Sequence, residues 1–212
     1  MKFKRADTIW RELRHHLPFT LVVSLIAGVL VALAFIFGWS SSKFLMGSFE
    51  TIHPLHVLVS AAATAAIYKK YKKSLLGAIF VGVVGAILIG SISDVLLPWI
   101  AGNLLSLETV FHLPIVEYPF LILGSAIVGA LFGIYVGLFE LNHSLHVFFS
   151  VFASLLYLLA FSSVMNVWLV LAISLIVFLV VYIPCCISDI VFPILFIKKP
   201  CKDCGHWHDG HD

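Results

Sequence analysis

Charged residues are scarce in this chain and are far outnumbered by hydrophobic ones. They make up 11% of its 212 residues, hydrophobic residues make up 61%, and the mean hydropathy is +1.09. A typical soluble protein carries about 25% charged residues, and a domain of this size leaves much of its surface in water. The composition therefore excludes soluble, disordered and disulfide-rich secreted proteins. It predicts an all-α polytopic membrane protein.

Six apolar stretches are long enough to cross a bilayer, for which a helix needs about 20 residues. No polar gap separates the fourth stretch from the fifth, so a turn near Glu140 is predicted from length alone. The sixth is long for one span, and Pro184 and Pro193 are expected to tilt or break it. The sequence thus predicts a multi-pass protein of a prokaryotic-type inner or plasma membrane. The predicted spans are 18–38, 45–68, 74–98, 118–138, 142–164 and 167–197.

The basic residues predict the orientation of the spans. Twelve of the 13 Lys and Arg residues precede the first span, separate the second from the third, or follow the sixth, and only Lys43 lies on the other side. Short cytoplasmic loops are enriched in Lys and Arg, so both termini are expected to be cytoplasmic. Beyond these flanking residues there is no basic patch, and nucleic acid is not an expected partner.

Part of the first half of the sequence returns in the second half. Residues 50–60 and 140–150 are identical at six of 11 positions, and the Ile-Ser-Asp and Pro of 92–98 return in 187–193. Each half holds three spans. Because three is odd, two halves of the same fold would have opposite orientations in the membrane. Such 3+3 inverted-topology repeats are typical of secondary transporters, whose substrate site lies between the halves.

The repeat predicts how the chain is organised. The expected segments are a basic cytoplasmic N-terminal segment (1–17), a first three-helix repeat (18–100), an external loop (101–117), a second three-helix repeat (118–197) and a cytoplasmic tail (198–212). Gly129, Gly133 and Gly137 recur at every fourth position of the fourth span. This spacing indicates close packing of helices.

Every repeated segment carries an acidic residue inside or beside a predicted span, and segments 50–60 and 140–150 also carry two histidines each. Ionisable groups there are costly unless paired or solvated, which makes them candidates for function. Residues three apart lie close together on a helix, so each Glu-x-x-His-x-x-His segment predicts a stripe of ligands. Two Glu-x-x-His pairs with two further carboxylates are the di-metal arrangement of helix bundles. The predicted metal ligands are Glu50, His53, His56, Asp94, Glu140, His143, His146 and Asp189.

Hydroxyl groups accompany these predicted ligands in both halves. Ser60, Ser93, Ser150 and Ser188 are expected to hydrogen-bond to the ligands and to orient them. At a rise of 1.5 Å per residue, Asp94 and Asp189 fall on opposite sides of the middle of their spans. The sequence therefore allows one central two-metal site or two equivalent staggered sites, of which the second better suits stepwise passage of an ion. Plain hydrogen bonding between helices is the structural alternative.

Cysteines add softer candidate ligands. Cys186 precedes Ser188 and Asp189, and a thiolate favours ions such as Zn²⁺, although buried cysteine is more often a small core side chain. In the tail, a Cys-x-x-Cys motif with nearby histidines suits tetrahedral zinc, with a solvated polar tail as the alternative. The tail residues concerned are Cys201, Cys204, His206, His208 and His211.

These features favour a divalent transition-metal transporter over an enzyme, with Zn, Fe or Mn as the ion. A cytosolic tail that collects ions slightly favours export. The first alternative is an intramembrane di-metal enzyme, either a di-iron oxidoreductase or a zinc hydrolase acting on a lipid. Both halves carry the same ligands, however, whereas catalysis usually needs distinct acid and base sides. A metal sensor or assembly subunit is the second alternative. The expected partners are membrane lipid and the metal ion. The sequence leaves open whether the protein forms a homo-oligomer.

Overall fold

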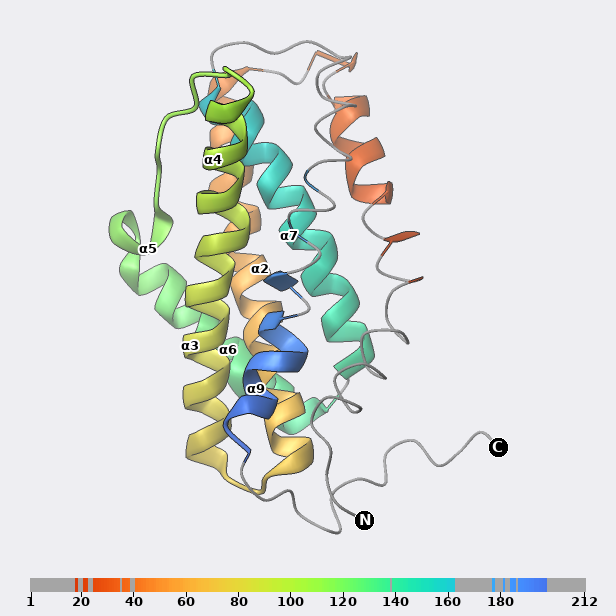
Figure 1. The fold of residues 1–212 in the computed structure, drawn as a ribbon, viewed down its shortest axis with the longest axis vertical. Coiled ribbons are helices and arrows are strands. Elements are labelled where there is room, and N and C mark those ends of the chain that lie inside the picture. The colour runs from red at the N-terminus through yellow and green to blue at the C-terminus, as the bar shows by residue number, and fades with distance from the viewer. Residues whose placement is uncertain are drawn as a thin grey trace.

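A computed structural model describes the central part of the chain and parts of its flanks. The described residues form helices and no strand (Figure 1). The N-terminal segment, most of the sixth predicted span and the tail lie outside them. The described residues are 18, 21–22, 25–34, 36–38, 41–137, 139–162, 177, 181, 184–185 and 187–197.

Helices occupy the predicted spans wherever the structure describes them. The second, third, fourth and fifth spans contain the long helices, and the third continues without a break through a π-helical turn, η1. Of the first span a helix is described over Leu25–Ala34, and of the sixth span its last part. The elements are α2 (Ser42–Tyr71), α3 (Leu75–Ser91), η1 (Ile92–Leu96), α4 (Leu97–Leu104), α5 (Pro114–Glu117), α6 (Pro119–Val136), α7 (Phe139–Phe161), η2 (Ile187–Val191) and α9 (Phe192–Leu195).

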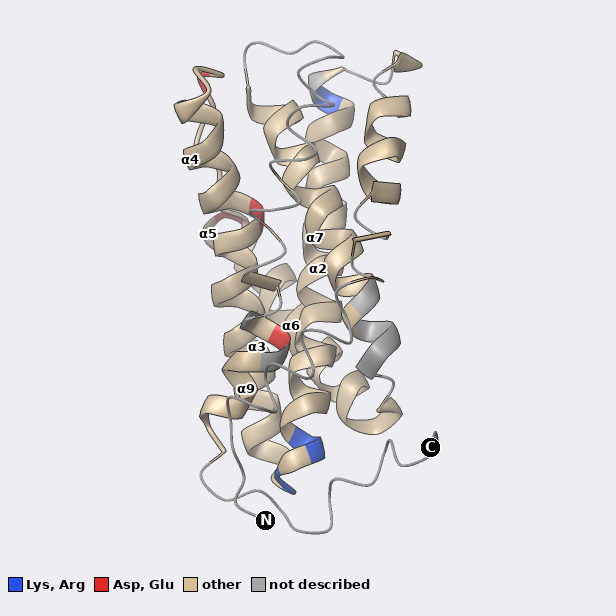
Figure 2. Ribbon diagram, turned by 45° about the vertical axis from the view of Figure 1, so that its right-hand side comes forward, with Lys and Arg blue, Asp and Glu red and all other residues tan. Residues whose placement is uncertain are grey.

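Three helical stretches are long and apolar enough to cross a membrane. They are Lys43–Tyr71, Leu75–Leu104 and Pro119–Val136, whereas Leu25–Ala34 and Leu145–Phe161 are apolar but shorter. Large apolar side chains such as Leu76 and Phe120 are exposed along the described surface. The described Lys residues lie at the two ends of the bundle, and only a few acidic residues lie between them (Figure 2). This distribution suits a protein surrounded by lipid.

The turn between α6 and α7 forms at Gly137. This residue ends α6 with a left-handed backbone, φ +69°, the conformation in which glycine commonly stops a helix. The turn thus precedes Glu140 by three residues. The packing role predicted for Gly137 is wrong, because its backbone has left the helix. Lys69 of α2 supports the same helix end by donating from Nζ to the carbonyl of Ile134, 2.8 Å away.

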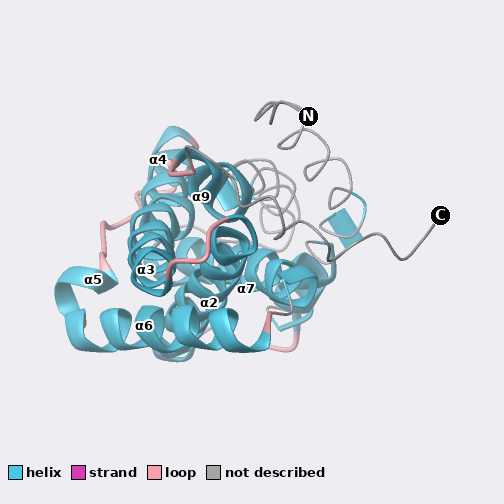
Figure 3. Cartoon of the chain, turned by 90° about the horizontal axis from the view of Figure 1, so that it is seen from below, coloured by secondary structure: helices cyan, strands magenta, loops and turns pink. Residues whose placement is uncertain are grey.

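Helix α2 occupies the centre of the bundle and packs against α3, α6, α7, η2 and α9. Figure 3 shows α6 lying across the other helices, which are seen end on. At this crossing Gly129 faces the backbone carbonyl of Leu58, and Gly133 faces that of Ala62. A Cβ atom at either glycine would overlap with that carbonyl oxygen. The predicted packing role of these two glycines is therefore confirmed.

The apolar core has two parts, and α2 contributes to both. Phe49 belongs to the part formed with α7, and Val57 to the part formed with α3, α6 and α9. His53 and His56 lie between Phe49 and Val57 along α2, and both histidines are fully buried. Between the two apolar parts of the core the histidines are shielded from water. A polar group buried in this way needs a hydrogen-bond partner or another polar ligand.

Candidate metal site

Two histidines of α2 converge on one carboxylate, which forms the first cluster: His53, His56 and Asp94. The Nδ1 atoms of His53 and His56 lie 2.9 and 2.5 Å from Oδ2 of Asp94, and all three side chains are buried. Since an ionised carboxylate only accepts, both imidazoles donate through Nδ1–H. Their Nε2 atoms are buried and have no hydrogen-bond partner among the described residues.

The second cluster has the same composition and geometry. His143 and His146 of α7 place their Nδ1 atoms 2.9 and 2.5 Å from Oδ2 of Asp189 in η2. These side chains are also buried. Each cluster groups three ligand atoms closely enough to hold a metal ion. Six of the eight predicted ligands are thus brought together as two matching sets of three.

The second oxygen of each aspartate accepts from a hydroxyl on the opposite half of the chain. Ser150 of α7 donates to Oδ1 of Asp94 at 2.8 Å, and Ser93 donates to the same oxygen at 2.9 Å. Thr64 of α2 donates to Oδ1 of Asp189 at 3.1 Å. Each carboxylate therefore has its own histidines on one oxygen and a hydroxyl from the other half on the second.

The four predicted serines all lie in this network, and two further hydroxyls join it. Ser60 pairs with Ser188 at 3.3 Å and Ser150 with Ser93 at 3.4 Å. Thr64 and Ser154, which were not predicted, reach the backbone carbonyls of Ser188 and Ser93 at 3.3 and 3.2 Å. A signal for them existed, because both stand four residues after a predicted serine.

A π-helical turn positions each aspartate. Asp94 is the third residue of η1 and Asp189 the third of η2, and a proline follows each aspartate by four residues. Pro98 has no N–H and so cannot bond to the carbonyl of Asp94 as in a regular helix. The wider turn instead lets Leu97 donate to the carbonyl of Ile92. π-Bulges of this kind occur frequently at functional sites.

The predicted ligand Glu50 lies apart from the first cluster. Its Oε1 accepts from the hydroxyl of Tyr118 at 3.2 Å, and no group of metal ligands among the described residues includes it. A step of three residues turns an α-helix by about −60°, so Glu50 and His56 point about 120° apart. The charge of Glu50 raises the pKa of the Tyr118 hydroxyl, which precedes α6. The side chain of Glu140 lies outside the described residues.

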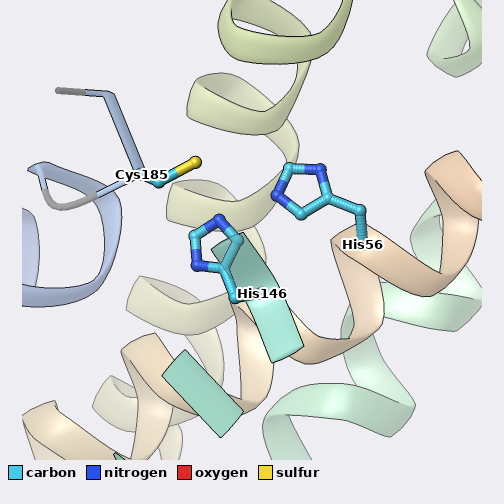
Figure 4. Close-up of side chains that lie close together, drawn as sticks. All are labelled: His56, His146 and Cys185. Atoms are coloured by element: carbon cyan, nitrogen blue, oxygen red, sulfur yellow. The ribbon is translucent and has the colours of Figure 1, made fainter. Parts of the chain in front are cut away.

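The two clusters meet through their inner histidines. The rings of His56 and His146 stack with centroids 4.6 Å apart and an interplanar angle of 26°. The two clusters therefore adjoin at these rings. Cys185 lies beside this pair (Figure 4). The predicted ligands Cys186, Cys201, Cys204, His206, His208 and His211 lie outside the described residues.

Aromatic side chains cover the first cluster on the side of the loop before α5. Phe49 stacks on His53 with a centroid distance of 5.5 Å and contacts the rings of His112, Tyr157 and Phe161. His112 lies in the predicted external loop and pairs with Glu117 at 2.8 Å. Phe49 therefore contacts both the cluster residue His53 and the loop residue His112.

Imidazole and carboxylate groups are ligands for first-row divalent ions, so the chemistry of both clusters fits a metal. No family model, curated protein or solved structure matches this chain. Function is therefore argued from the site alone.

Proposed function

We propose that this protein transports a divalent transition-metal ion across a membrane. The observation that carries the proposal is the pair of buried His-His-Asp clusters, which match in composition and in distances. Buried ionisable groups inside apolar helices are costly, and a role in plain helix packing would not require two such sets. An ion substrate explains both the cost and the duplication.

The sequence repeat, interpreted as two halves of opposite orientation, supports this proposal. Residues 50–60 and 140–150 supply the histidines of the two clusters, and 92–98 and 187–193 supply the aspartates. In transporters with inverted repeats the substrate site lies at the interface of the halves, and here hydroxyls of each half bond to the carboxylate of the other. A movement of one half against the other would change the surroundings of both aspartates together.

The chain would cross the membrane six times with cytoplasmic termini. Lys43 and the pair Lys69 and Lys70 stand at opposite ends of α2, as the orientation requires. Zn²⁺, Fe²⁺ and Mn²⁺ are the candidate ions, because a set of two imidazoles and one carboxylate suits each of them. Export remains slightly favoured by the Cys- and His-containing tail, and lipid is the expected surrounding.

Metal flux into proteoliposomes tests this function. The full-length protein should move Zn²⁺, Fe²⁺ or Mn²⁺, and Asp94→Asn or Asp189→Asn should abolish the flux, because an amide cannot replace the carboxylate that both histidines share. Glu108→Gln, at an exposed acidic residue of the loop after α4, is the matched control and should transport normally. Normal flux in both aspartate variants would refute the proposal.

The intramembrane di-metal enzyme stays the second candidate, and the contact between the two clusters favours it over a sensor. An enzyme keeps its catalytic metal, whereas a carrier must release its ion. Protein purified with stoichiometric metal that survives dialysis against a mild chelator would favour the enzyme. Metal that binds when supplied and then washes away would favour the transporter.

A further inference from the structure

Three potential ligands converge where the two clusters meet. His56 comes from α2, His146 from α7, and Cys185 from the segment before η2, and one ligand atom of each lies within 4.8 Å of the others. All three side chains are buried. Figure 4 shows the thiol and one nitrogen of each ring turned toward the space between the three side chains.

The hydrogen bonds within the two clusters leave one nitrogen of each inner histidine, His56 and His146, available to face this space. The Nδ1 atoms of His56 and His146 are engaged by Asp94 and Asp189, so Nε2 is the atom that each ring can offer. Nε2 of His56 is completely buried without a hydrogen-bond partner among the described residues. A buried acceptor of this kind is costly when it is left unsatisfied. A bound cation would remove that cost.

We propose that His56, His146 and Cys185 form a third metal site, midway between the two clusters, that selects borderline to soft divalent ions such as Zn²⁺. This central site rests on the proposed transport function and specifies its substrate class. Two imidazoles and a thiolate favour Zn²⁺ over Mn²⁺, which prefers oxygen ligands. Three protein ligands also leave the fourth tetrahedral position open, as a site that must release its ion requires.

The arrangement fits the dimensions of zinc coordination. Bonds of about 2.0–2.1 Å to nitrogen and 2.3 Å to sulfur place tetrahedral ligand atoms roughly 3.4 Å apart. The three atoms lie within 4.8 Å of one another, so closure by at most about 1.4 Å completes a tetrahedral set of this size. Asp94 and Asp189 already hold the outer nitrogens of the two rings. Carboxylates in this position fix the orientation of histidine ligands and raise their basicity.

The central site explains why the two clusters touch. His56 serves the first cluster through Nδ1 and the central site through Nε2, and His146 serves the second cluster in the same way. A neutral imidazole has one lone pair for a metal, so the central site and an outer cluster cannot use the same ring simultaneously. Moving an ion between a cluster and the centre therefore requires the ring proton to shift from one nitrogen to the other, so that each ring binds one ion at a time.

Cobalt absorption tests the central site. The full-length variant Cys186→Ser/Cys201→Ser/Cys204→Ser keeps Cys185 as its only thiol, since the chain has four cysteines. Adding Co²⁺ should produce a thiolate-to-cobalt charge-transfer band in the near ultraviolet. The further change Cys185→Ser should abolish this band, while equilibrium dialysis still detects cobalt on the two clusters.

The outcomes separate this inference from the proposed function. If the folded single-thiol protein binds cobalt without a charge-transfer band, the central site is wrong and the metal clusters stand. If it binds no cobalt at all, the proposed function fails as well.

A second measurement uses the natural chain with Cys185→Ser alone. Its Zn²⁺ affinity should fall by more than about tenfold, the lower end of the loss caused by removing a partner of a ligand, with Mn²⁺ affinity unchanged. Equal losses for both ions would also overturn the central site.

Discussion

The hydroxyl of Ser150 lies 2.8 Å from Oδ1 of Asp94, although 56 positions separate the two residues in the sequence. Ser150 belongs to α7, which carries the histidines of the second cluster, whereas Asp94 binds those of the first. Each cluster thus depends on the opposite half of the chain. The hydrogen bonds that each aspartate accepts from the opposite half can therefore be used to test whether the two halves act together.

Ser150→Ala should weaken metal binding at the first cluster by about 10–100-fold, the usual effect of losing a group that orients a ligand. The reason is that, among the described residues, Oδ1 of Asp94 then keeps only its hydrogen bond from the neighbouring Ser93. Titration of the detergent-purified protein with Co²⁺ or Zn²⁺ measures the change.

Ser154→Ala is the matched control for this prediction. Ser154 is buried on the same helix, one turn further on, but it donates to the backbone carbonyls of Ser93 and Ser150 instead of to a carboxylate. Its loss should lower the free energy of unfolding by about 1 kcal/mol and leave metal affinity within about twofold. Equal losses of affinity in both variants would show that Ser150 acts through helix packing.

Glu50→Gln should leave cobalt binding at the first cluster nearly unchanged, because the Glu50 carboxylate bonds to Tyr118 and lies apart from Asp94. His53→Gln, three residues further along α2, should instead remove one of the three ligands and weaken binding by at least about tenfold. Parallel cobalt titrations compare the two variants. A similar loss in both would establish Glu50 as a fourth ligand, as the sequence predicts.

Gly133→Ala should destabilise the crossing of α2 and α6 by about 1–3 kcal/mol, the cost of overpacking. A Cβ atom at Gly133 would overlap with the carbonyl of Ala62. Thermal unfolding in detergent measures the effect. Gly124→Ala on the same helix is the control, because its Cβ would meet nothing within 4 Å and alanine favours the helix by about 0.5–1 kcal/mol. Equal stability of the two alanine variants would contradict the close contact.

The sequence predicts the helices and most of the ligands because both can be recognised from patterns in the linear sequence. Apolar runs of spanning length locate α2, α3, α6 and α7. The repeated His-x-x-His and Ser-Asp motifs identify the six residues of the two clusters. Polar residues that recur inside apolar segments need one another as partners, so their grouping could be expected before any contact was known.

What the sequence could not predict depends on rotation and on contacts between distant segments. Glu50 shares the three-residue spacing of His53 and His56, but the helix turns its side chain away toward Tyr118. The sequence did not single out Cys185, which lies beside His56 and His146, and the predicted ligand Cys186 lies outside the described residues. One residue along a helix changes direction by about 100°, and the π-helical turn that follows Cys185 shifts this phase further.

Gly90→Cys tests both the repeat and the central site. Gly90 precedes Asp94 by four residues, just as Cys185 precedes Asp189. A Cβ atom at Gly90 would lie 3.6 Å from Cε1 of His56, an ordinary van der Waals contact, so the position has room for a side chain. If the two halves are equivalent, a thiol at residue 90 approaches His56 as Cys185 approaches His146. In the protein without other cysteines, Gly90→Cys should therefore restore the cobalt charge-transfer band lost with Cys185→Ser.

Ala86→Cys, one turn earlier on α3, is the control and should not restore it. A folded Gly90→Cys protein that binds cobalt but lacks the band would contradict the equivalence of the two positions, because the same ligand placed by the same motif would then meet a different environment.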